Sequence, residues 1–341
     1  MELQLKNIGM IKEANVKIDG LTVIAGENDT GKSTVGKALF LAYSSMPQDI
    51  KTTQYSDLIN LGRLNVVGSQ IKKKIFSKKT FNNESELRIT SNGKAFIYAD
   101  KFPQDKLATK DISIASVAFI ETPVVWNLQD MFRSSSDIES HLKLVGESID
   151  IPYPYLMKDL YFKLATKREY SEEWTKEFRN KITSIINGEF IKDEDGIFRF
   201  HKDKATYDLV DIATGIKTFG ILQVLLDNNR LNSYSLLILD EPEVHLHPKW
   251  QLKIANIIVE LVKNGVKVLV NSHSPYMIEA LQRYSEVEKI NSDFYLAEDG
   301  YIKKENDSNS ETLAKIFEKL SEPFDVFEEM DSQRMEQLIN G

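Results

Sequence analysis

The sequence contains no cysteine, no long apolar run and no internal repeat. The absence of cysteine among 341 residues excludes thiolate and disulfide chemistry, and nothing in the composition requires an oxidising compartment. No apolar stretch reaches the roughly 18 residues that a membrane-spanning helix needs. The first residues, Met1-Glu2-Leu3-Gln4-Leu5-Lys6, lack the basic and apolar segments of a signal peptide. We therefore expect a cytoplasmic protein without a membrane partner.

Basic charge is also scarce, because 51 acidic residues stand against 43 basic ones and give a net charge of −8. Residues 305–341 carry −7 of this charge, so the rest of the chain is nearly balanced. A protein that coats nucleic acid is usually basic overall, and this one is not. One basic cluster, Lys72-Lys73-Lys74-Ile75-Phe76-Ser77-Lys78-Lys79, is a candidate for contact with nucleic-acid phosphates, with Phe76 able to stack on a base. A solvated helix face, with Phe76 in the core, is the simpler interpretation.

Apolar strand-like segments alternate with helical segments along much of the chain. Strands are expected at 3–6, 14–18, 21–25, 114–121, 236–239 and 266–271, and helices at 32–43, 213–228, 248–263 and 275–283. This alternation predicts an α/β fold with a mainly parallel sheet and antiparallel strands at the N-terminus. Hairpins are expected at 86–99 and 190–201, and helices over most of 126–188.

Three parts of the chain follow from this pattern. Residues 1–45 and 205–300 are expected to form one discontinuous α/β domain, and 46–204 an inserted strand and helical lobe in which Trp126, Met131 and Phe132 serve as core or subunit contact. Residues 301–341 form an acidic helical tail, in which apolar residues recur at helical spacing: Leu313, Ile316, Phe317 and Leu320, continued by Phe324, Phe327 and Met330. We expect this helix to dock on the body of the chain, with binding of a partner protein as the alternative.

A glycine-bearing segment fits the phosphate-loop pattern G-x-x-x-x-G-K-[ST]. It reads Gly26-Glu27-Asn28-Asp29-Thr30-Gly31-Lys32-Ser33, follows the apolar run 21–25 and opens a helix. The glycines let backbone N–H groups converge on phosphate oxygens at a helix N-terminus. Lys32 can then reach the β- and γ-phosphates, and the Ser33 hydroxyl can ligate Mg²⁺.

Two acids follow a second apolar strand. Asp240 and Glu241 come directly after Leu236-Leu237-Ile238-Leu239. A buried strand delivers Asp240 to the carboxyl edge of the sheet, where it can hold Mg²⁺ directly or through water. Glu241 points elsewhere and can polarise a water against the γ-phosphate. A pair of acids in an ordinary turn is the alternative.

In combination, these motifs resemble those of the ABC-type P-loop ATPases, in particular the soluble SMC/RecF/OLD-like branch. The segment Asp240-Glu241-Pro242-Glu243-Val244-His245-Leu246-His247-Pro248 is similar to the DEPExHLHP motif of OLD-family ATPases. Further motifs are Thr214-Gly215 at the start of a helix and His273 after the strand 268–272. The resemblance covers 1–45 and about 205–300, and it implies an ABC-type ATPase domain there.

The resemblance implies a role for each motif residue. Residues Gly26 to Thr34 would bind the phosphates of ATP, with Lys32 also acting in catalysis, and Ser33 and Asp240 would hold Mg²⁺. Glu241 would be the catalytic base and His273 the switch histidine near the γ-phosphate. Thr214 and Gly215 would contact the γ-phosphate bound to a second subunit, and a helix N-cap is the alternative for Thr214. Glu121 stands at a strand end where the glutamine loop of the family is expected, and is a further candidate ligand for Mg²⁺.

A zinc site is a competing interpretation of one cluster. Glu243, His245, His247 and His273 are all possible ligands, and His-x-His places two imidazoles on one face of a strand. We favour the ATPase motif, because it accounts for the cluster and because Pro248 begins a helix directly after it.

The resemblance also implies a function. It predicts Mg²⁺-dependent ATP hydrolysis by a homodimer that sandwiches two ATP molecules, in DNA maintenance or phage defence, with a separate nuclease or toxin as effector. Nucleic acid remains a possible partner. The alternatives are the ATP-binding subunit of a membrane transporter, a small-molecule phosphotransferase and a binder that uses ATP as a clamp without turnover.

Overall fold

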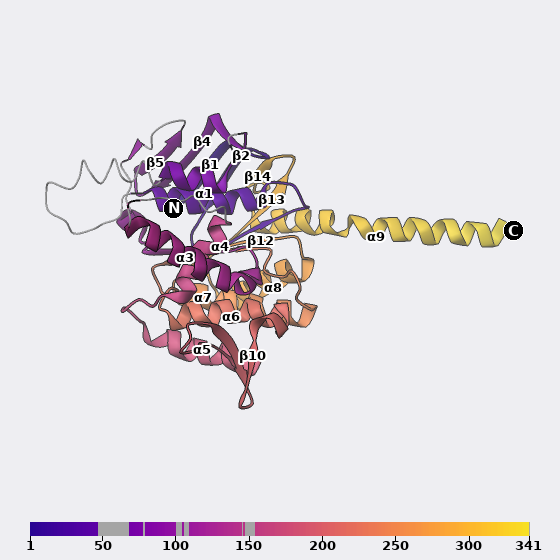
Figure 1. Ribbon diagram of the computed structural model, residues 1–341. Helices are drawn as coiled ribbons and strands as arrows, with labels where there is room; N and C mark the ends of the chain where they lie inside the picture. Colours follow the sequence, from indigo (N-terminus) through magenta and orange to yellow (C-terminus); the bar gives the residue numbers. More distant parts are fainter. Residues whose placement is uncertain are drawn as a thin grey trace.

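The computed structural model describes residues 1–46, 68–77, 79–99, 104–105, 109–144, 146 and 154–340. The predicted α/β fold is confirmed, since the described helices and strands build a large mixed sheet covered by helices (Figure 1). None of the helices in these ranges is both long and apolar enough to cross a membrane.

One sheet of eleven strands organises the molecule. Its strands are β1 (Glu2–Ile8), β2 (Ile11–Lys17), β3 (Leu21–Ala25), β4 (Phe81–Ser91), β5 (Lys94–Ala99), β6 (Gln104–Asp105), β7 (Ser116–Ile120), β11 (Ser235–Asp240), β12 (Lys267–Ser272), β13 (Ser292–Glu298) and β14 (Tyr301–Lys303). Their order is β6-β5-β4-β1-β2-β14-β13-β3-β12-β11-β7. The five strands from β13 to β7 run parallel, whereas β6, β5, β4, β1 and β2 pair antiparallel.

Helices cover the sheet, and one of them also contacts a second, smaller sheet. They are α1 (Lys32–Ser45), residues 68–75, α3 (Gln129–Leu144), α4 (Tyr155–Ala165), α5 (Glu173–Ile186), α6 (Thr214–Asp227), α7 (Pro248–Lys263), α8 (Pro275–Glu288) and α9 (Asn309–Asn340), with short 3₁₀ segments at Thr109–Ile112, Pro123–Leu128 and Leu209–Asp211. A second sheet contains β8 (Glu189–Lys192), β9 (Phe198–Lys202) and β10 (Ala205–Asp208). Both predicted hairpins are present, as β4–β5 and β8–β9.

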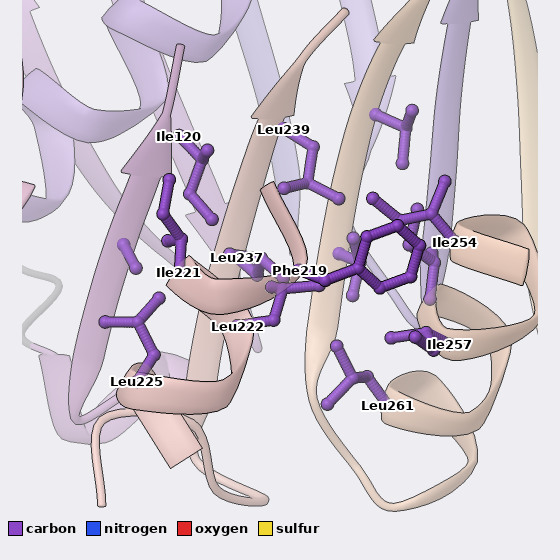
Figure 2. Packing of buried hydrophobic residues seen from close by; sticks show 14 of the residues in the cluster. Ile120, Phe219, Ile221, Leu222, Leu225, Leu237, Leu239, Ile254, Ile257 and Leu261 are labelled. Atoms are coloured by element: carbon purple, nitrogen blue, oxygen red, sulfur yellow. The ribbon is translucent and has the colours of Figure 1, made fainter. Parts of the chain in front are cut away.

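The parallel strands are buried on both faces. Along β11, Leu237 and Leu239 belong to one apolar cluster, while Leu236 and Ile238 belong to another. This alternation follows from the two-residue period of a strand. Figure 2 shows Leu237 and Leu239 facing the side chains of α6 and α7, and α1 contributes to the cluster on the opposite face. The near-continuous apolar run of β11 is therefore what a doubly covered strand requires.

The range 46–204 contributes to the sheet as well as to a helical layer. Strands β4, β5 and β7 fall in this range: β4 pairs with β1, β5 with β4, and β7 with β11, while α3, α4 and α5 lie outside the sheet. Trp126 and Phe132 are core residues, whereas Met131 is 42% exposed. The division of the chain into an ATPase domain and an inserted lobe stays a prediction.

The tail is one helix, α9 (Asn309–Asn340), whose first turns pack on the body of the protein. Leu313 and Ile316 are buried in the cluster that contains α6 and α7, and Phe317 and Leu320 pack against it. Beyond this point Val326, Phe327 and Met330 are more than half exposed, and the helix extends away from the body (Figure 1). The expected docking on the body thus holds for the first three turns. The Phe324 side chain lies outside the described residues.

Candidate functional site

The four candidate motifs meet because of the order of the strands. In the parallel part of the sheet, β3, β12, β11 and β7 are neighbours. The segments that follow them begin at Gly26, His273, Glu241 and Glu121, respectively. Since the carboxyl ends of parallel strands lie at one edge of a sheet, residues separated by more than 200 positions in the chain share one site.

The loop between β3 and α1 has the backbone that its glycines allow. Gly26 and Gly31 have φ angles of 155° and 92°, and Asp29 has 64°. A Cβ atom on Gly26 would lie 2.4 Å from the carbonyl oxygen of Ala297, and one on Gly31 would lie 2.9 Å from Cγ1 of Ile11. Glycine is therefore required at both positions, by conformation and by close approach. Gly31 is also the N-cap of α1, whose free N–H groups open toward the loop.

Within this loop, Lys32 points back toward the backbone. Its Nζ donates to the carbonyl oxygens of Gly26, over 2.9 Å, and Glu27, over 2.5 Å. Burial lowers the pKa of Lys32, and the negative charges of Glu241 and Asp240 oppose this shift. Glu27, Asn28 and Asp29 are exposed, while Thr30 donates to the Glu27 carbonyl over 2.9 Å. The loop thus holds an ammonium group at a helix N-terminus, an arrangement suited to anions.

Asp240 is buried beside two hydrogen-bond donors. The Nδ2 group of Asn271, on the neighbouring strand β12, donates to Oδ1 of Asp240 over 2.8 Å. Burial raises the pKa of Asp240, whereas the hydrogen bonds from Asn271 and Ser33 lower it. The structure therefore places the predicted metal ligands Ser33 and Asp240 in direct contact. Hydroxyl and carboxylate oxygens are the ligands that Mg²⁺ prefers.

Glu241 and His273 are also adjacent. Nδ1 of His273 lies 3.2 Å from Oε1 of Glu241 and 3.8 Å from Oε1 of Glu243. Glu241 has a φ of 51°, a conformation that non-glycine residues seldom adopt, and its N–H donates to the carbonyl of Asn271 over 2.9 Å. This turn carries the Glu241 side chain away from Asp240 and toward His273.

A cavity of about 250 Å³ opens beside these groups. Ser33, Glu121, Asp240 and Glu241 line it, together with residues of the turn after β7 and Thr218 of α6. Glu121 lies 3.2 Å from Nζ of Lys37 on α1, so its carboxylate is paired with an ammonium group. No group of three or more His, Asp or Glu side chains that could hold a metal exists within the described ranges. Ligands from the protein would therefore need to be completed by substrate phosphates and water, as is usual for Mg²⁺.

Thr214 and Gly215 begin α6, as predicted, and lie against the loop that follows Glu241. A Cβ atom on Gly215 would lie 2.9 Å from Cδ2 of Leu246 and 3.6 Å from the carbonyl oxygen of His245. The cap position of α6 belongs to Ala213, so the alternative that Thr214 caps the helix is wrong. Thr34 is the third residue of α1, and its N–H bonds to the Gly31 carbonyl over 3.0 Å.

Two further candidates have structural roles. Nδ1 of His247 accepts from the N–H of Lys249 and caps α7, over 3.3 Å, and His245 is exposed. In the basic cluster Phe76 is buried, with its ring 5.7 Å from that of Phe81. The favoured interpretation, Phe76 in the core, is therefore confirmed, and the alternative that it stacks on a base is wrong. Lys72 lies over the Phe81 ring at 4.1 Å. Lys78 falls outside the described residues.

Sequence reasoning missed the contributions of Asn271 and Glu243. It treated Asn271 as part of a strand, and weighed Glu243 only as a zinc ligand. The signal for Glu243 was present, since it is a third acid three residues after Asp240 and stands between two apolar residues, Pro242 and Val244. Asn271 could have been found only from the pairing of β11 with β12, which the sequence does not reveal.

Comparison with known protein families finds one match in the second half of the chain. The family described as "AAA domain, putative AbiEii toxin, Type IV TA system" matches residues 211–279. This stretch contains α6, β11, α7 and β12, and therefore Asp240, Glu241 and His273.

Two curated proteins are similar over short stretches. The Retron Vc95 probable ATPase of Vibrio cholerae serotype O1 biovar El Tor is 32% identical over 98 residues, which are 28% of this chain and 18% of that protein. The Septu protein PtuA of Bacillus thuringiensis is 36% identical over 45 residues, which are 13% of this chain and 11% of that protein. The chain thus matches less than a fifth of the length of each relative.

The solved structures that match this chain over most of its length have low sequence identity to it and low TM-scores. The ADP conformation of MJ1267, an ATP-binding cassette of an ABC transporter, is 16% identical, with a TM-score of 0.39 over 95% of this chain and 96% of that one. The SMC head domain from Thermotoga maritima is 14% identical, with a TM-score of 0.39 over 86% of this chain and 93% of that one. Over residues 211–279, the chain is similar to AAA-family ATPase domains.

Proposed function

We propose that this protein binds ATP together with Mg²⁺ and hydrolyses it. The observation that carries the proposal is the meeting of the loop 26–33, Asp240, Glu241 and His273 at one edge of the sheet, around a cavity lined by Ser33, Asp240 and Glu241. The match of residues 211–279 to an AAA domain supports it.

In this proposal the loop 26–34 binds the phosphates. Lys32 exchanges its bonds to the carbonyls of Gly26 and Glu27 for phosphate oxygens, since an ammonium group prefers an anion to a neutral carbonyl. Ser33 and Asp240 would hold Mg²⁺, with Glu121 as a further ligand once it leaves Lys37. A bound Mg²⁺ ion would supply charge stabilisation to the transferring phosphoryl group.

Glu241 acts as the base that orients water, and His273 acts beside the γ-phosphate. Glu241 is partly exposed and borders the cavity, so it can approach a water in front of the phosphate. The left-handed backbone at Glu241 directs its side chain toward His273, so the adjacent residues Asp240 and Glu241 can take separate roles, one on Mg²⁺ and one on water.

We further propose that the active form is a homodimer, in which Thr214 and Gly215 of one subunit complete the site of the other. Such a dimer would open and close with hydrolysis and act on a separate nuclease or toxin in the cytoplasm. DNA maintenance or phage defence is the proposed setting. The similarity to a retron ATPase and to a Septu protein supports it.

The test is phosphate release from ATP and Mg²⁺ without an added acceptor. We expect turnover by the wild type, loss of nucleotide binding in Lys32→Ala, and retained binding with turnover reduced by about 100-fold or more in Glu241→Gln. Glu84→Gln, an exposed site on β4, is the matched control and should behave as wild type. Equal turnover in wild type and Glu241→Gln would contradict the assignment of the base. Turnover only with an acceptor would favour a phosphotransferase.

The dimer is tested separately by light scattering of Glu241→Gln with ATP and Mg²⁺. We expect the mass to double on addition of ATP and not on addition of ADP. A persistent monomer would contradict the shared site.

A further inference from the structure

Glu243 is a buried carboxylate behind the edge that carries the site. Its side chain is 3% exposed, and Oε1 accepts two hydrogen bonds, from the Ser272 hydroxyl over 2.6 Å and from the His273 N–H over 3.1 Å. Its second oxygen, Oε2, is buried and has no hydrogen-bond partner among the residues that the structure describes. Burying an acid in this way is costly, and an apolar residue would fill the same volume at lower cost. A reason for the acid must therefore be sought in what it touches.

What Glu243 touches is the switch histidine. Oε1 of Glu243 lies 3.8 Å from Nδ1 of His273, and Oε1 of Glu241 lies 3.2 Å from the same nitrogen. Two carboxylates thus lie near one ring nitrogen, although Nδ1 makes no hydrogen bond to any residue that the structure describes. Negative charge on both acids attracts an N–H and repels a lone pair at this nitrogen, so it favours a proton on Nδ1 and leaves Nε2 as the other contact atom of the ring.

The two carboxylates are not equivalent. Glu241 is 31% exposed and borders the cavity, whereas Glu243 is enclosed by β12 and the turn before α7. In the proposed reaction Glu241 turns toward water, and it then no longer serves Nδ1 of His273. Glu243 cannot turn away, because its Oε1 is held by Ser272 and by the backbone of His273.

The turn that carries His273 is fixed on its other side as well. The Ser274 hydroxyl donates to Oε1 of Gln251 over 2.7 Å, and Gln251 donates to the carbonyl of Leu246 over 3.1 Å. The main chain on both sides of His273 is therefore anchored to the segment that follows Glu241. These hydrogen bonds fix the main chain at His273 but do not fix the orientation of its imidazole ring.

We propose that Glu243 is a positioning residue for His273: it holds the proton on Nδ1 and keeps the ring in place when Glu241 engages water. This inference rests on the proposed role of His273 in hydrolysis. Carboxylates that orient a functional histidine through its second nitrogen are a general device, and their loss commonly costs about 10- to 100-fold in activity.

The test compares the ring of His273 in four proteins without nucleotide, by ¹⁵N NMR of the imidazoles. They are wild type, Glu241→Gln, Glu243→Gln and the double variant, and His273→Gln assigns the signal among the five histidines. Gln at 243 can still accept from Ser272 and the His273 N–H, so it removes the charge and keeps the shape. We expect Nδ1 to stay protonated in Glu241→Gln and to lose its proton in the double variant. An unchanged Nδ1 signal in the double variant would overturn the inference.

Turnover supplies the second readout. We expect Glu243→Gln to lower kcat by about 10-fold or more with little change in KM, since it acts on the reacting geometry and not on binding. Ser272→Ala, which removes the neighbouring donor without removing the charge of Glu243, should lower kcat much less.

A second pair of variants serves if Glu243→Gln unfolds. Glu243→Asp keeps the charge and should retain more activity than Glu243→Ala. Equal activity of these two variants would overturn the inference. The two proposals can fail separately. A wild type that does not hydrolyse ATP would contradict the proposed function, whereas the NMR measurement needs no hydrolysis and still tests the role of Glu243.

Discussion

Asn271 donates a hydrogen bond to Asp240 at the point where β12 and β11 end side by side. The Nδ2–Oδ1 distance is 2.8 Å, and the two residues are paired in the register of the strands. Asp240 is 7% exposed and Asn271 is fully buried, so water cannot take the place of either partner in this hydrogen bond. The carboxylate proposed to hold Mg²⁺ is thus oriented by the neighbouring strand.

Replacement of Asn271 with Leu should therefore destabilise the protein and disturb the proposed Mg²⁺ site. Leu has a similar volume but donates no hydrogen bond, which leaves a buried carboxylate oxygen unsatisfied. We expect the free energy of unfolding to fall by about 1–3 kcal/mol at neutral pH. Urea unfolding measures this loss. Asn180→Leu, at an exposed position of α5, is the control, and an equal loss there would contradict the explanation.

The stability of the protein should depend on pH through Asp240. Burial raises its pKa above the ordinary value of 3.8, so the native state binds this proton more tightly than the unfolded chain does. The resulting stability is present below about pH 3.8 and is lost as the pH rises through the pKa in the native state. Asp240→Asn removes the ionisation, and we expect it to be more stable than wild type at pH 7.

This difference should shrink as the pH is lowered from 7 toward 4. Urea unfolding in the absence of metal at several pH values measures it, and Asp203→Asn, an exposed site after β9, is the matched control. A wild type that is more stable than Asp240→Asn at pH 7 would show that the hydrogen bonds of the carboxylate outweigh its burial.

Gly220 should be intolerant of a side chain. A Cβ atom there would lie 2.4–2.5 Å from three ring atoms of Phe190, which is itself packed between Trp126 and Phe200. Although Ala favours a helix over Gly by about 1 kcal/mol, the overlap should dominate and give a net loss of about 1–3 kcal/mol. Thermal unfolding of Gly220→Ala measures it.

The control for Gly220→Ala is the double variant with Phe190→Leu, which removes the ring. We expect the two changes to be clearly non-additive, with the double variant more stable than the sum of the single losses. Additive losses would mean that the ring is not the obstacle.

The two halves of α9 should differ sharply in their effect on stability. Ile316 is fully buried, and Ile316→Ala should cost about 2–5 kcal/mol of unfolding free energy. Val326 is 54% exposed, and Val326→Ala should change it by no more than about 0.5 kcal/mol. Chemical denaturation of both variants measures the contrast, and similar losses would show that the second half of α9 is packed against something.

Much of the site could be predicted from the sequence because its motifs are local. The loop 26–33 needs only a strand, two glycines and a helix start, and Asp240 needs only a run of apolar residues before it. Both signals are contiguous in the chain. The predicted strands and helices around them are confirmed, with ends that shift by a few residues at most in α6, β11, β12 and α7. The chemical roles of the residues stay predictions.

The rest depends on which strands become neighbours, which no local pattern records. The pairing of Asp240 with Asn271 exists because β12 lies beside β11, and Lys37 meets Glu121 because α1 packs next to β7. The hairpin of β4 and β5 belongs to the main sheet because β4 pairs with β1, across a gap of more than 70 residues. The direction of the Glu241 side chain depends on a left-handed backbone that few glutamates adopt.

The packing of the first turns of α9 on the body has a mechanical consequence. The helix is held by β13, which pairs with β3, the strand that leads into the phosphate loop. The 20 residues after its last buried turn span about 30 Å, so a tilt of about 10° at the base would carry the tip through roughly 5 Å. An ångström-scale adjustment near the loop would thus be magnified toward the far end of the helix.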